Sequence, residues 1–138
     1  MADSQLKENP VQRTVRIVVA IPGVMMLLSG LQWLFRPQAA AEGLGMPLLE
    51  GVARSTQIGD LGSFFLATST MILLGAIKAN AQWLHGAALL LGGAALMRLA
   101  SLMHGAEFAT QFILAEVVMT AILLICAAKL DPAAEGAN

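Results

Sequence analysis

Four long apolar runs constrain this 138-residue chain more than any other feature of its sequence. They cover roughly residues 14–35, 54–77, 83–103 and 108–130. A helix over the first run, about 22 residues at about 1.5 Å each, is about 33 Å long, enough to cross the hydrocarbon core of a bilayer. Only 12% of the residues are charged, about half the share in soluble domains. The sequence therefore predicts an all-α integral membrane protein, a four-helix transmembrane bundle.

The domain organisation follows from the same pattern. Residues 1–13 are polar and unpatterned, so we expect a flexible N-terminal tail. Residues 14–130 form the four-helix transmembrane domain, and residues 131–138 form a second flexible tail.

The connections differ in length. The longest, residues 36–53, lies between the first two helices, on the outer side of the membrane. Pro37 suits the first position of a helix, so a short helix over residues 38–42 is expected to end at Gly43 or Gly45. The two later joints are short, which makes neighbouring helices antiparallel.

The first apolar run also has features of a cleaved signal peptide. Arg13 and Arg16 precede it, and Ala39-Ala40-Ala41 offers a small-residue cleavage site. Its apolar stretch is longer than the usual 7–15 residues of a signal peptide, which favours retention as a membrane span.

The distribution of lysine and arginine predicts the orientation. One side of the predicted bundle carries most of the cations: Lys7, Arg13, Arg16, Lys78 and Lys129. The other side has Arg36 and, at its boundary, Arg54. Both termini are therefore expected to be cytoplasmic, with the long loop facing outward.

Six of the polar residues in or at the edge of the apolar runs are the candidate ligand-binding residues: Gln32, Arg54, Gln57, Asp60, Arg98 and Glu116. Ionisable groups inside a membrane span are costly and often mark function. By helical rise, Asp60 lies about 9 Å inside Arg54, and Arg98 and Glu116 lie about 8 and 12 Å below the outer ends of their helices. Gln32 is about 5 Å deep. Four helices thus place polar groups in the outer half of the bilayer.

Two interpretations of these groups stay open. Arg54 and Arg98 balance Asp60 and Glu116, so the charges could form interhelical ion pairs that fix helix order, as buried charge requires. We expect at least one of the two carboxylates to contact Arg98. Alternatively, the cluster lines a cavity open to the outside, which binds the polar head of an amphiphile.

Other functions find little support in the sequence. A net charge of −1 provides no basic surface for nucleic acid. The single cysteine, Cys126, excludes an internal disulfide and is expected to be a packed, unreactive thiol. His85 and His104 fall near opposite membrane faces, so no metal site is predicted. No catalytic motif is recognisable, and no cofactor is predicted.

Several short segments resemble a family of small bacterial membrane proteins that is similar to the DoxX-like superfamily. They are Leu44-Gly45-Met46-Pro47, Ala53-Arg54, Arg98-Leu99-Ala100-Ser101-Leu102 and Ile113-Leu114-Ala115-Glu116-Val117. The resemblance covers most of residues 14–130 and implies a four-helix fold in the bacterial inner membrane. Some DoxX-like proteins are linked to quinone-coupled sulfur oxidation. No residue here matches a known catalytic pattern, so no catalytic role is carried over.

Three functional hypotheses remain. The first is a non-catalytic accessory subunit that binds a lipid or quinone, alone, as a homo-oligomer or in a larger membrane complex. The second is an intramembrane enzyme that uses Asp60 or Glu116 for proton transfer, which requires one of these carboxyls to be unpaired. The third is an oligomeric transporter coupled to protons or ions.

Overall fold

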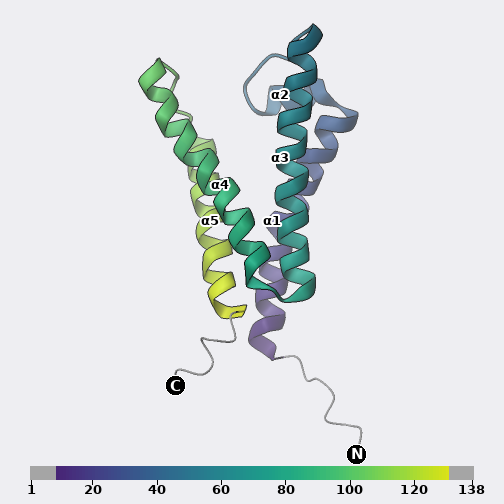
Figure 1. The fold of residues 1–138 in the computed structure, drawn as a ribbon, viewed down its shortest axis with the longest axis vertical. Helices are drawn as coiled ribbons and strands as arrows, with labels where there is room; N and C mark the ends of the chain where they lie inside the picture. The colour runs from purple at the N-terminus through teal and green to yellow at the C-terminus, as the bar shows by residue number, and fades with distance from the viewer. Residues whose placement is uncertain (1–8, 131–138) are drawn as a thin grey trace, which may run out of the picture.

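The computed structural model describes residues 9–130, which are entirely helical apart from their connections, with no strand in that range (Figure 1). Four helices are long and two helical segments are short. In chain order they are α1 (Pro10–Phe35), α2 (Pro37–Gly43), α3 (Gly51–Lys78), α4 (Ala81–Ser101), the 3-10 turn η1 (Leu102–His104) and α5 (Thr110–Leu130).

Four helical segments of the described chain are long and apolar enough to cross a membrane: α1, α3, α4 with η1, and α5. Large apolar side chains cover their outer surfaces, among them Ile21, Leu28, Leu89 and Leu114, each at least 60% exposed. A surface of this kind is stable in contact with lipid but not in contact with water. The chain is therefore a small multi-pass membrane protein.

The predicted spans and the short helix are confirmed, with shifts at their ends. α1 begins at Pro10 rather than at the predicted Thr14, because proline fits the first turn and the Asn9 side chain accepts a hydrogen bond from the Val11 N–H at 3.0 Å. The predicted helix after Pro37 is α2, which ends at Gly43. The predicted tail 131–138 and the first eight residues lie outside the described residues.

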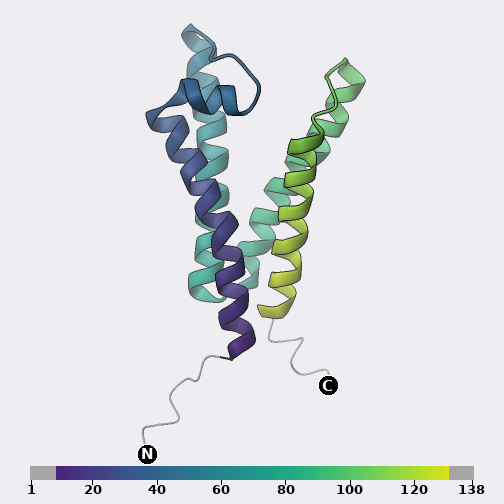
Figure 2. The same ribbon diagram turned by 180° about the vertical axis from the view of Figure 1, so that it is seen from behind.

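The long helices are arranged as two pairs rather than as an even bundle. α1 packs chiefly against α3, and α4 against α5. The pairs meet where α1 begins, α3 joins α4 and α5 ends; we call this the closed end. They diverge toward α2 and η1, which we call the open end, so the molecule has the outline of a V (Figures 1 and 2).

The main core lies toward the closed end and draws on all four long helices. Val19, Ile72, Leu84 and Leu123 are fully buried there, one from each helix. Alanines at positions 76, 87, 88 and 127 let the helices approach closely. This core fixes the two pairs to each other at one end only.

The pair of α1 and α3 depends on a close contact at Gly30. A Cβ atom on this residue would lie 2.6 Å from Leu66 Cδ2 and 3.1 Å from the Leu66 backbone nitrogen. Since the backbone of a helix cannot move aside, only glycine allows this approach. The contact holds α1 and α3 together beyond the main core.

A second, smaller core closes the open end of the α1–α3 pair. The Trp33 side chain is 1% exposed and packs with Ala40 and Ala41 of α2. Leu44 and Met46 of the following loop pack against this group. The long connection is therefore folded down onto α1 and α3, and it brings Leu44 to the space between the two pairs.

Candidate functional site: a cavity between the helix pairs

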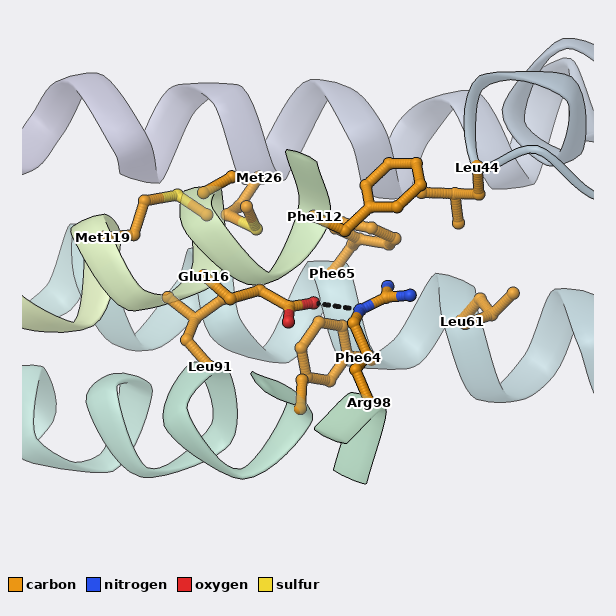
Figure 3. Close-up of a pocket in the computed structure, with 12 residues that line it drawn as sticks. Met26, Leu44, Leu61, Phe64, Phe65, Leu91, Arg98, Phe112, Glu116 and Met119 are labelled. Atoms are coloured by element: carbon orange, nitrogen blue, oxygen red, sulfur yellow. Dashed lines mark hydrogen bonds and ion pairs between the residues drawn. The ribbon is translucent and has the colours of Figure 1, made fainter. Parts of the chain in front are cut away.

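A cavity of about 250 Å³ lies where the two helix pairs diverge (Figure 3). α3, α4 and α5 supply most of its lining, with Met26 of α1 and Leu44 from the loop after α2. The lining is aliphatic and aromatic except for two side chains, Arg98 and Glu116. An apolar cavity with a few convergent polar groups is the usual form of a small-molecule site.

Arg98 of α4 and Glu116 of α5 form an ion pair that joins these two helices. Arg98 Nε donates a hydrogen bond to Glu116 Oε1 at 2.9 Å. The Glu116 side chain is 10% exposed and the Arg98 side chain 34% exposed. The expectation that Arg98 contacts a carboxylate from another helix is thus confirmed, with Glu116 as the partner.

The rest of the Arg98 guanidinium is turned toward the cavity. Its central carbon lies 5.0 Å from the centroid of the Phe112 ring, a cation–π contact. Its two terminal nitrogens point away from Glu116, toward the part of the cavity near Leu44 (Figure 3). Neither nitrogen donates a hydrogen bond to a described residue. Arg98 therefore offers hydrogen-bond donors to a molecule in the cavity.

The second oxygen of Glu116 is left without a partner. Oε2 is buried and accepts no hydrogen bond from any described residue. An unsatisfied carboxylate oxygen in an apolar surrounding costs about 1–3 kcal/mol or more. A donor group on a bound molecule, or a water molecule, removes that cost.

Two predicted site residues, Gln57 and Arg54, contact the loop before α3 instead of the cavity. Gln57 Oε1 accepts from the Leu49 N–H at 2.9 Å, and Gln57 Nε2 donates to the Pro47 carbonyl at 3.1 Å. Arg54 Nε donates to the Leu49 carbonyl at 2.7 Å. Both side chains satisfy loop backbone groups that would otherwise lack partners near the membrane surface.

The remaining two predicted residues also lie outside the cavity. Asp60 is exposed on α3, and Gln32 is exposed on α1, where it lines a smaller hollow beside α2. Leu44 and Phe65 line both that hollow and the main cavity. The expected single cluster of six polar residues is therefore not formed: of the six, only Arg98 and Glu116 line the main cavity.

Aromatic residues are the part of the lining that sequence reasoning missed. Phe64, Phe65 and Phe112 all line the cavity, although the chain has only five phenylalanines and no tyrosine. This concentration of a scarce residue type in the same outer region as Arg98 and Glu116 was the available signal. Phe64 and Phe65 also contact each other edge to face, with ring centroids 5.5 Å apart.

Within residues 9–130, no group of three or more histidine, cysteine, aspartate or glutamate residues is placed to hold a metal ion. Cys126 is buried in the main core.

Comparisons of the chain with models of protein families, with curated proteins and with solved structures gave no match.

Removing Arg98 alone should destabilise the fold, because the buried Glu116 would lose the only charged partner it has among residues 9–130. We expect Arg98→Leu to cost about 3 kcal/mol of unfolding free energy. The double variant Arg98→Leu/Glu116→Leu should recover most of that loss. Thermal unfolding in a mild detergent, followed by circular dichroism, measures the coupling between the two substitutions.

Arg54 provides the matched control for this experiment. It is also an arginine toward the open end, but its guanidinium donates to the Leu49 carbonyl and forms no ion pair with a carboxylate of residues 9–130. Arg54→Leu combined with Glu116→Leu should show additive effects. Additive effects for Arg98 and Glu116 as well would contradict a direct pair.

Proposed function

We propose that this protein binds an amphiphile of lipid or quinone size, with its polar head in the cavity between the helix pairs, and acts as a non-catalytic binding or accessory subunit. The observation that carries the proposal is the incomplete pairing of Arg98 and Glu116. Two guanidinium nitrogens and one carboxylate oxygen have no hydrogen-bond partner among the described residues. A buried carboxylate oxygen in this state is usually satisfied by a bound molecule or water, and the half-buried Arg98 nitrogens beside it can donate to the same molecule.

The two groups define the chemistry of the proposed head group. The arginine nitrogens require an acceptor, such as a carbonyl, carboxylate or phosphate oxygen. A charged Glu116 requires a donor, such as a hydroxyl or an amine. A head group that has both an acceptor and a donor satisfies the whole pair.

The size and lining of the cavity favour an amphiphile over a soluble metabolite. About 250 Å³ is below the usual range of about 300–1,000 Å³ for pockets that enclose a whole drug-sized ligand. It suffices for a head group or a ring. Phe64, Phe65 and Phe112 provide flat apolar surfaces for a ring, and the tail would lie between the helix pairs.

A quinone as the bound amphiphile agrees with the resemblance to DoxX-like proteins. That resemblance is itself a proposal, which rests on the short segments quoted above and on the four-helix architecture.

A second candidate function, proton transfer to or from a bound molecule, has one specific observation in its favour. Glu116 lines the cavity, and its Oε2 has no hydrogen-bond partner among the described residues, although its Oε1 is paired with Arg98. Asp60, the other carboxyl considered for this role, is exposed on α3.

Lipids and quinones that co-purify with the protein test the proposed binding. Wild type should retain a molecule that the double variant Arg98→Leu/Glu116→Leu loses, since this variant removes the polar groups and keeps the cavity. Ala94→Phe should lose it too, because the ring fills the cavity while the ion pair stays intact. Mass spectrometry of organic extracts identifies and counts the bound molecules.

Arg54→Leu is the control, since Arg54 does not line the cavity, and it should retain the molecule at the level of wild type. A preparation of wild type that holds no amphiphile in stoichiometric amount, or equal retention by Ala94→Phe, would contradict the proposed site.

We further propose that the closed end faces the cytoplasm and that the membrane is a bacterial inner membrane, as the lysine and arginine distribution and the resemblance suggest. Single cysteines at Ser4 and Glu42, each in a Cys126→Ala background, should then differ in labelling by an impermeant maleimide in intact cells. Glu42 should be labelled and Ser4 protected; the reverse pattern would invert the orientation.

A further inference from the structure

A second hollow, at the closed end, is independent of the cavity around Arg98. It has a volume of about 430 Å³ and lies between the first turns of α1 and the last turns of α3. Arg13 and Arg16 form its polar side, and Ile17 and Leu73 contribute to its apolar side. Ala20 and Ala76 leave room between the helices.

The two arginines are held differently. Arg16 Nε donates to the Ala76 carbonyl at 2.6 Å, and Arg16 Nη2 donates to the Ile77 carbonyl at 3.3 Å. Arg16 is thereby fixed at the C-terminal end of α3, where a cation is favoured by the helix dipole. Arg13 is exposed, and its side chain makes no hydrogen bond or ion pair with any described residue.

At the closed end, all charged side chains of the described residues are positive. Arg13, Arg16, Lys78 and Lys129 lie there. The carboxylates of residues 9–130 are at the other end or in the half next to it: Glu42, Glu50, Asp60, Glu107 and Glu116. No described carboxylate therefore neutralises Arg13.

The polar and apolar parts of the hollow are ordered along the membrane normal. Arg13 and Arg16 are three residues apart and share a face of α1 near its start. From the helical rise per residue, Ala20 lies about 10 Å further along α1 than Arg13. A molecule bound here would place its charge at the membrane surface and its apolar part against Ile17, Ala20 and Leu73.

We propose that this hollow is a site for an anionic phospholipid, whose phosphate accepts hydrogen bonds from Arg13 beside the positive charge of Arg16, and whose acyl chain runs along α1 and α3. Guanidinium groups bind phosphate oxygens with paired hydrogen bonds. Basic hollows between membrane helices at the level of the head groups bind anionic lipids by this chemistry. The site depends on neither the cavity around Arg98 nor its ligand.

Native mass spectrometry of the full chain, released from detergent micelles, tests the site. Phosphatidylglycerol should bind wild type more tightly than phosphatidylcholine does. Arg13→Gln should weaken the binding of phosphatidylglycerol about five-fold, as expected for one cation near the membrane surface, and leave the thermal stability unchanged. Arg13→Lys should retain most of the affinity, since it keeps the charge.

Lys129→Gln is the matched control. Lys129 is an exposed cation at the same end of the molecule, but it lines a different hollow, between α1 and α5. It should leave phosphatidylglycerol binding within about two-fold of wild type. Equal losses in Arg13→Gln and Lys129→Gln would show only general attraction by surface charge and overturn the site.

Inorganic phosphate separates a lipid site from a phosphate site. Because the acyl chain contributes to binding, phosphate at millimolar concentration should not displace phosphatidylglycerol. Displacement by phosphate, or equal affinity of wild type for the two lipids, would contradict the proposal.

Discussion

The ion pair between Arg98 and Glu116 joins α4 to α5 in the part of the molecule where these helices have diverged from α1 and α3. The main core cannot hold them together there, since it lies toward the closed end. Because the surroundings are apolar, the attraction between the charges is weakly screened and separation would be costly. The pair thus keeps the second helix pair intact beside the cavity.

The first helix pair is held together in the same region by different means. Gly30 allows α1 and α3 to touch, and Gln57 and Arg54 fasten the loop before α3 to that helix. Each pair is therefore stable on its own side of the cavity. Among the described residues, the buried side-chain atoms without a hydrogen-bond partner are Ser69 Oγ on α3 and Glu116 Oε2, and the latter lies beside the cavity between the two helix pairs.

The spans were predictable because bilayer thickness sets the length of an apolar helix, and short joints set its direction. A contact of Arg98 with a carboxylate of another helix followed from the same geometry, since depth can be counted along antiparallel helices, but depth did not decide between Asp60 and Glu116. The sequence pattern did not predict the directions in which the Gln57 and Asp60 side chains point. They are three residues apart on α3, yet Gln57 is buried against the loop and Asp60 is exposed. Only the fold of the loop decides this, and no periodic pattern encodes that fold.

The most direct test of a ligand-binding cavity is a crystal structure of wild type grown from a lipid mesophase, without added ligand. We expect density for an amphiphile in the cavity, with an acceptor within hydrogen-bond distance of the terminal nitrogens of Arg98 and a donor near Glu116 Oε2. A cavity closed by contact between the two helix pairs, with both polar groups satisfied by protein atoms, would contradict the account.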